Sequence, residues 1–346
     1  MGENSTPLQK PRYDWLDAIK AVAMAFVIFV HLGLNGFTTF VMYTSFLKLP
    51  LFFAASGFVF NPKKKMSIKQ FLITRSQRIL VPFICLSIIL CIFDLFTYDG
   101  TLVEWAKHSL DLICMGEIMW FFPTLFLCNF LMFIIFKITK ENDALVIISA
   151  VISLILGYFC ITGKHIFMTV NAVFVAYPMC VFGYYLKSLL ALIKKNYLII
   201  IATISMIIFI ALPAIYKYRT GKFNYINLFS SLYCSYFYNM LVAFSGVLAF
   251  FIFFSFMKFP KFVVKFGQNT IFYYAFHIPA CKLIMFLLAT FVSPKFDASL
   301  LSASRKGILI YSAVTLFTLI VLAPICALVN KYIPFIVGSK KKKLKQ

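Results

Sequence analysis

A lysine and a histidine stand inside the first apolar run of the sequence, WLDAIKAVAMAFVIFVHL over residues 15–32. Lys20 lies near the start of the run and His31 near its end. Ionisable groups inside a membrane are costly in free energy and are usually functional. A histidine can act there as a general acid or base, and a lysine can hold an anionic group. The run therefore combines the composition of a membrane span with the side chains of a reactive site.

Lys20 and His31 share one face if this run is a helix. Eleven residues at ~100° each turn through ~1100°, which is ~20° from three whole turns, and they rise by ~16 Å. A ligand that contacts both side chains must be long, with an anionic group near Lys20 and a reactive group near His31. A phosphopantetheine arm has this form, because its thioester lies far from its phosphates. Membrane anchoring explains Lys20 equally well, since lysines extend to the surface at the ends of spans.

Few other ionisable residues qualify for buried chemistry. None of the 11 Asp and Glu residues falls near the middle of an apolar run, so we expect neither a carboxylate pair nor a bound metal there. The nine cysteines contain no C-x-x-C pair, and most fall inside apolar runs, as structural thiols do. His277 is the second histidine within a predicted span. A structural hydrogen bond and a catalytic role are equally open for it.

Membrane helices must position these side chains. The chain is 62% hydrophobic and only 13% charged, whereas soluble domains carry about 25% charged residues. We predict an all-α, polytopic transmembrane bundle that forms a single domain over residues 1–338, followed by a basic cytosolic tail over 339–346. The second run contains Pro50 and Gly57 and the eighth is unusually long, so both are expected to be irregular. About ten spans are predicted, near residues 17–36, 45–61, 79–97, 118–138, 144–162, 166–187, 196–216, 229–257, 270–293 and 307–333.

Basic residues set the predicted orientation. Cytosolic loops of membrane proteins are enriched in Lys and Arg, and an even number of spans puts both termini on one side. With both termini in the cytosol, most of the 33 Lys and Arg residues fall on the cytosolic side. The net charge of +22 then reflects topology, and we expect no nucleic-acid partner. Lys20 is thus expected near the cytosol and His31 in the outer half of the membrane.

Five segments resemble, in order, the motifs of the acyltransferase family 3 of integral membrane proteins. The family pattern in the first is Asp, then Arg or Lys, ten residues and His. The third carries Arg75 and Arg78 at the family's arginine positions, and the last ends in a histidine, here His277. The segments are WLDAIKAVAMAFVIFVH (15–31), LPLFFAASGFVF (49–60), FLITRSQRILVPF (71–83), MWFFPTLFL (119–127) and FGQNTIFYYAFHIP (266–279). Lys20 departs from the more common arginine, although a sugar-acetylating subgroup uses lysine.

The resemblance implies an O-acyltransferase of the bacterial plasma membrane. Such enzymes move acyl groups, usually acetyl, from cytosolic acyl-CoA to hydroxyl groups of sugars in surface polysaccharides or lipid-linked glycans. Acyl-CoA would be a donor substrate and not a permanently bound cofactor. The expected partners are therefore acyl-CoA, the sugar acceptor and membrane lipids, and the acyl group could be acetyl or a larger one such as succinyl.

The resemblance also assigns roles to residues. Lys20, Arg75 and Arg78 are predicted to bind the phosphates of CoA, although the two arginines could instead anchor the protein to acidic lipid. Neutral His31 is the predicted catalytic base, which takes a proton from the acceptor hydroxyl and returns it to the leaving thiolate. A transient acyl-imidazole at His31 is the alternative chemistry.

Four further residues are candidates for supporting roles. Asp17 could orient Lys20 through an i,i+3 contact, or it could simply be favoured by the helix dipole. Glu117 and Trp120 lie at the outer rim of the fourth span, where Glu117 could contact the acceptor and Trp120 could be an interfacial anchor. His277 is the fourth candidate for a supporting role.

Two functions of other classes remain open at the level of sequence. A carrier or exporter of a lipid-linked glycan would use His31 to line its translocation path, and a membrane sensor or scaffold would have no turnover. The lack of carboxylates in the middle of the spans argues against proton-driven transport.

Overall fold

The computed structural model describes residues 12–32, 39–62, 66–161, 166–292 and 305–339. Most of them are helical, and the sheet among them is an antiparallel ribbon of β1 (Ile226–Asn227) and β2 (Leu232–Tyr233). The predicted all-α class is confirmed. From residue 340 on, the basic tail predicted over 339–346 lies outside the described residues.

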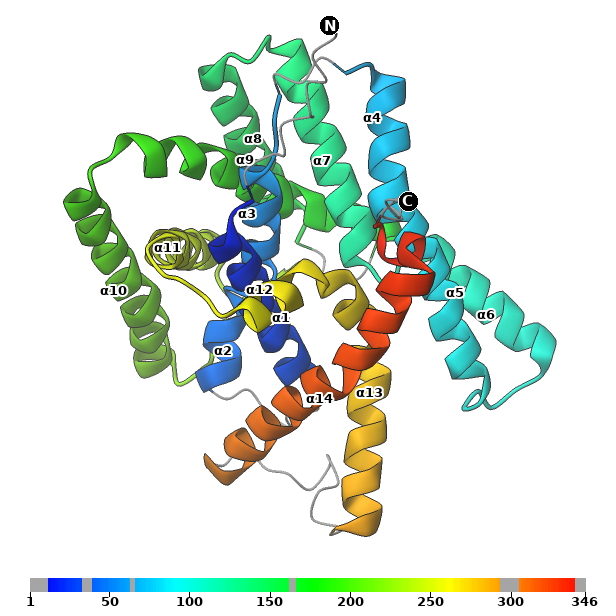
Figure 1. The fold of residues 1–346 in the computed structure, drawn as a ribbon. Helices are drawn as coiled ribbons and strands as arrows, with labels where there is room; N and C mark the ends of the chain where they lie inside the picture. Colours follow the sequence, from blue (N-terminus) through cyan, green and yellow to red (C-terminus); the bar gives the residue numbers. More distant parts are fainter. Residues whose placement is uncertain (1–11, 33–38, 63–65, 162–165, 293–304, 340–346) are drawn as a thin grey trace, which may run out of the picture.

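The helices follow one another along the chain and pack into one bundle (Figure 1). Short turns connect some of them: the π-helical η1 (Ser76–Leu80) and the 3-10 turns η2 (Phe167–Thr169) and η4 (Pro334–Val337). The helices are α1 (Asp14–His31), α2 (Thr39–Ser45), α3 (Pro50–Phe58), α4 (Ile68–Arg75), α5 (Val81–Leu95), α6 (Leu102–Met115), α7 (Phe121–Ile138), α8 (Asp143–Phe159), α9 (Val170–Leu192), α10 (Lys195–Thr220), α11 (Tyr236–Ser255), α12 (Lys261–Gln268), α13 (Thr270–Phe291) and α14 (Arg305–Tyr332).

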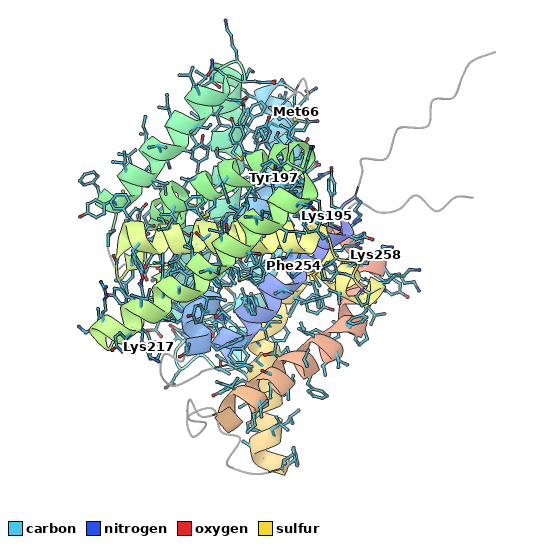
Figure 2. All side chains as sticks on the ribbon, turned by 90° about the vertical axis from the view of Figure 1, so that its left-hand side faces the viewer. Met66, Lys195, Tyr197, Lys217, Phe254 and Lys258 are labelled. Atoms are coloured by element: carbon cyan, nitrogen blue, oxygen red, sulfur yellow. The ribbon has the colours of Figure 1, made fainter. Side chains whose placement is uncertain are left out.

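Each predicted apolar run coincides with a helix, and the chain is a polytopic helical membrane protein. In the described part of the chain, eight helical segments are long and apolar enough to cross a membrane. Two other runs coincide with α8, a shorter apolar helix, and with α1, which carries charged residues in its first two turns. Figure 2 shows α10 crossing α11, with Lys195 and Tyr197 near one end of α10 and Lys217 near the other. The eight segments are Thr39–Phe58, Ile68–Leu95, Phe121–Ile138, Phe167–Leu192, Lys195–Thr220, Tyr236–Ser255, Thr270–Phe291 and Gly307–Tyr332.

The two runs expected to be irregular are both interrupted. The second divides into α2 and α3, because α2 ends at Ser45 and α3 begins anew with Pro50 in its first turn. In the eighth, the predicted helix start at residue 229 is wrong. Residues 226–233 form the β1–β2 ribbon, in which Ile226 faces Tyr233, and α11 begins only at Tyr236.

Helix α6 lies between the third and fourth predicted runs, where the hydropathy pattern predicts no helix. Its first turn is closed by a capping box, in which the Thr101 hydroxyl accepts from the backbone N–H of Glu104 and the Glu104 carboxylate accepts from the N–H of Thr101. Its end is marked by Gly116 in the left-handed conformation. The charged residues on this amphipathic helix lower its mean hydropathy, and hydropathy alone therefore misses it.

Helix α1 lies in the core and passes from one hydrophobic cluster into another (Figure 1). Its first half contributes Leu16 and Ile19 to the cluster formed mainly by α3, α7, α9 and α11. Its second half contributes Met24 and Ile28 to the cluster formed mainly by α13 and α14. Both ends of α1 are thereby held by different groups of helices.

Helices α3 and α9 approach so closely that only glycine fits at two positions. A Cβ atom at Gly57 would collide with the backbone carbonyl of Cys180, and one at Gly183 would collide with that of Ala54. Small residues allow helix backbones in membranes to pack in this way. This contact holds α3, and with it the break between α2 and α3, against the rest of the bundle.

Replacement of Gly183 by valine should separate α3 from α9. Overpacking of this kind costs about 1–3 kcal/mol of folding free energy. We expect Gly183→Val to lower the melting temperature of the detergent-solubilised protein measurably. Ala191 lies on the exposed part of the same helix, so Ala191→Val should melt with the wild type. Equal melting temperatures for the two variants would contradict the close approach.

Candidate functional site

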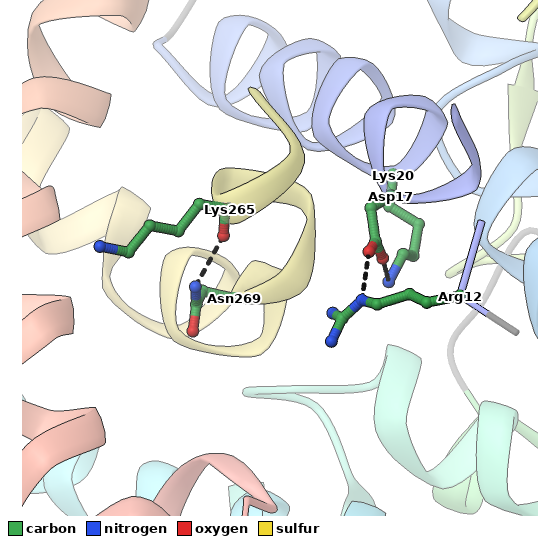
Figure 3. A network of polar contacts seen from close by, with 5 residues as sticks. All are labelled: Arg12, Asp17, Lys20, Lys265 and Asn269. Carbon is green, nitrogen blue, oxygen red and sulfur yellow. Dashed lines mark hydrogen bonds and ion pairs between the residues drawn. The ribbon is translucent and has the colours of Figure 1, made fainter. Parts of the chain in front are cut away.

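The buried carboxylate of Asp17 organises one end of α1. Nζ of Lys20 lies 2.7 Å from its Oδ1, and Nε of Arg12 donates to its Oδ2 at 3.0 Å (Figure 3). The i,i+3 contact expected between Asp17 and Lys20 is confirmed. Arg12, which precedes the apolar run and was not predicted, is the second partner. Two cations on one carboxylate leave this network with an excess of positive charge.

A pocket of about 640 Å³ opens beside this network, and we call it the Lys20 pocket. Its charged lining residues are Arg12, Asp17, Lys20 and Lys187, so cations outnumber carboxylates three to one. Its walls are otherwise largely apolar, with side chains from α1, α3, α7 and α13. An anionic group at the mouth and an apolar chain further in are the ligand chemistry that this lining suits.

Arg75 and Arg78 lie next to this pocket in sequence but do not line it. Arg75 ends α4 and packs over the ring of Phe71, with 5.7 Å between its Cζ and the ring centroid. Arg78 lies in the π-helical turn η1, and the next residue, Ile79, does line the pocket. The structure therefore groups Lys20 with Arg12 and Lys187. A shared ligand for Lys20, Arg75 and Arg78 stays a prediction.

His31 and His277 meet at the other end of α1. Their ring centroids are 4.9 Å apart, with the rings nearly perpendicular at 82°. Nδ1 of His31 lies 2.7 Å from the carbonyl oxygen of Val27, and Nδ1 of His277 lies 2.7 Å from that of Tyr274. A carbonyl oxygen only accepts, so in each neutral ring Nδ1 carries the hydrogen and Nε2 keeps its lone pair. The site therefore brings together two imidazoles, each with an Nε2 that can accept a hydrogen bond.

The two imidazoles differ in access. The side chain of His31 is exposed, whereas His277 is 3% exposed. Nε2 of His277 is buried and has no hydrogen-bond partner among the residues that the structure describes. A buried polar atom without a partner is costly and uncommon in folded proteins, and it often marks a place where a ligand binds.

A second pocket of about 830 Å³ contains both histidines, and we call it the His31 pocket. The structure places Glu117 and Trp120 on its wall together with His31 and His277, so four of the predicted candidates share one pocket. Sequence reasoning missed Lys48, whose signal was a lysine within an apolar run directly before the break at Pro50. The other polar and aromatic residues that line the His31 pocket include Asp94, His108, Tyr225, Asn227, Phe229 and Lys282.

A single wall separates the two pockets. Leu49 and Tyr274 line both of them. The ring of Tyr274 packs against Phe121 and Phe122, at centroid distances of 5.7 Å and 5.6 Å. The carbonyl of Tyr274 is also the acceptor that fixes the tautomer of His277. Tyr274 of the wall and His277 of the histidine site thus lie within one turn of α13.

Comparison with known proteins supports the motifs read from the sequence. A family model described as an acyltransferase domain, that of acyltransferase family 3, matches residues 13–327. The match includes α1 with Lys20 and His31, and α13 with His277. Comparison with curated proteins and with solved structures gave no significant match. The match covers nearly the whole chain, which therefore belongs to acyltransferase family 3 and is a membrane acyltransferase.

Proposed function

We propose that this acyltransferase moves a short acyl group, acetyl in the first instance, from acyl-CoA in the Lys20 pocket to a sugar hydroxyl in the His31 pocket. One observation carries the proposal: a cationic pocket and a two-histidine pocket lie at opposite ends of α1 and share the wall at Leu49 and Tyr274. By the positive-inside rule, the Lys20 pocket would open to the cytosol of a bacterium. The alternative of a glycan carrier lacks a comparable supporting observation.

The charges of the Lys20 pocket support a phosphate-bearing donor. Lys20, Arg12 and Lys187 would face the phosphates of CoA, with Asp17 holding Lys20 and Arg12 in place. A lysine meets a phosphate as a point charge and an arginine meets it through a planar fork, so Arg12 could supply the geometry that Lys20 lacks. Arg75 and Arg78 would contact the more exposed nucleotide part.

The length of α1 matches the reach of the donor. Lys20 and His31 are separated by ~16 Å along the helix, and the pantetheine arm would cover this distance. On its way the arm would pass the wall, where the side chains of Leu49 and Tyr274 face both pockets. Movement of these two residues would join the pockets.

The lining of the His31 pocket supports a sugar acceptor. Trp120, Tyr225 and Phe229 offer flat apolar surfaces, against which the C–H face of a sugar ring can pack. Asp94 and Glu117 offer carboxylates that accept hydrogen bonds from hydroxyl groups. An apolar surface with a few polar groups is typical of sites that fix the orientation of a small polar ligand.

The proposed reaction is direct acyl transfer with His31 as the general base. Nε2 of His31 takes the proton of the acceptor hydroxyl while the hydroxyl oxygen attacks the thioester carbon. The tetrahedral intermediate then expels the CoA thiolate, which receives the proton from the His31 imidazolium. The hydrogen bond from Nδ1 to Val27 holds the ring in the required tautomer. Nε2 of His277 can accept a hydrogen bond from the acceptor and so orient it.

Replacement of His31 by alanine should abolish transfer by removing the base. General-base catalysis contributes about 10²–10⁴-fold, so we expect ester-linked acetate on the surface glycan to fall at least 100-fold in cells that carry His31→Ala. His108 lines the same pocket and its side chain is exposed, so His108→Ala is the matched control and should retain most of the activity. Unchanged acetylation by His31→Ala, at confirmed expression, would show that the base is wrong.

Replacement of Lys20 by methionine tests the phosphate site. Hydrogen bonds to charged groups contribute about 1.5–3 kcal/mol, so Lys20→Met should raise KM for acetyl-CoA about 10–100-fold. Acetyl-pantetheine lacks the phosphates, and its use by wild type and variant should differ little. Lys20→Arg should restore the KM for acetyl-CoA. An equal loss with both donors would contradict a phosphate contact and would favour an anchoring role for Lys20.

A further inference from the structure

Lys48 lies in the turn that separates α2 from α3 and lines the pocket that contains the two histidines. Its backbone N–H still donates to the carbonyl of Thr44 at 2.9 Å, but the helix does not continue, because Pro50 starts α3. Lys48 is half-buried and lines the His31 pocket. His31 and His277 line the same pocket, so the charge of Lys48 and the two imidazoles share one cavity.

Lys48 has no counter-charge in the part of the chain that the structure describes. The ion pairs found there both belong to Asp17, at the far end of α1. Asp94 and Glu117 line the same pocket as Lys48, yet neither forms an ion pair with it. An unpaired cation that is partly removed from water is costly, and such charges are normally paired with an anion. The structure therefore leaves room for an anion beside the two histidines.

Neither histidine can serve as the donor that an oxyanion needs. Both Nδ1–H groups are used by backbone carbonyls, and both Nε2 atoms are acceptors in the neutral rings. Attack on a thioester nevertheless moves a full negative charge onto the carbonyl oxygen, at the place where the acceptor hydroxyl meets His31. A fixed donor or cation at that place is usually a large part of catalysis.

We propose that Lys48 is a catalytic residue whose ammonium group stabilises the oxyanion of the tetrahedral intermediate. This inference rests on the proposed function. As the acceptor oxygen bonds to the thioester carbon, the electron pair of the C=O π bond moves to the carbonyl oxygen, beside Lys48. When the C–S bond breaks, that pair re-forms the carbonyl, and the thiolate leaves with the proton from His31. Lys48 stays protonated throughout, so no proton is gained or lost at this residue.

The test uses Lys48→Met in membrane vesicles, with radiolabelled acetyl-CoA as donor and the membrane glycan of the same cells as acceptor. Loss of one oxyanion donor typically lowers kcat by about 10²–10³-fold, and we expect that loss in maximal rate with KM for acetyl-CoA changed less than about 3-fold. Lys48→Arg, which keeps the charge, should recover part of the rate. Lys195 is exposed on α10 and lines neither pocket, so Lys195→Met should behave as the wild type.

Several outcomes would overturn the inference. A normal maximal rate for Lys48→Met would exclude the role, and a raised KM with an unchanged maximal rate would mean that Lys48 binds an anion in the ground state. A lower melting temperature with no rescue by arginine would indicate a structural role. If wild-type vesicles transfer no acetyl group, the proposed function fails. If wild type transfers, His31→Ala does not, and Lys48→Met does, only the inference about Lys48 fails.

Discussion

The fixed length of α1 is the constraint on which the site depends. Lys20 and His31 lie on one helix, so the distance between the cationic end and the imidazole end cannot change unless that helix bends. Two separate hydrophobic clusters hold the two halves of α1, which keeps it straight and central. Other elements then bring partners to its ends: Arg12 joins Lys20 at one, and His277 and Lys48 join His31 at the other.

Backbone carbonyls decide what the histidine end can do. Helix α1 directs the carbonyl of Val27 to Nδ1 of His31, and α13 directs that of Tyr274 to Nδ1 of His277. Each helix thereby selects the tautomer of its own histidine and leaves both Nε2 atoms as acceptors. Two hydrogen-bond acceptors in one pocket with the cation of Lys48 suit a substrate that donates a proton and a reaction that creates negative charge.

Local patterns predicted what lies along one helix and missed what tertiary packing brings together. The shared face of Lys20 and His31, and the Asp17–Lys20 contact, follow from helical spacing alone. The proximity of His31 to His277 joins residues far apart in the chain, so no periodicity contains it, although the hydropathy pattern and the family motif each singled out His277 as a candidate. The inward direction of Lys48 depends on the break before Pro50 and on the close contact of α3 with α9, and hydropathy describes neither.

The wall at Leu49 and Tyr274 has a consequence for the membrane itself. A protein with a pocket at each end would short-circuit the bilayer if its pockets were joined by water, because each elementary charge gains about 2.3 kcal/mol per 100 mV of potential. The packing of Tyr274 against Phe121 and Phe122 closes that path with apolar rings. A bound donor arm would displace these rings and would itself close the path between the pockets. Electrical insulation and catalysis would thus depend on the same few side chains.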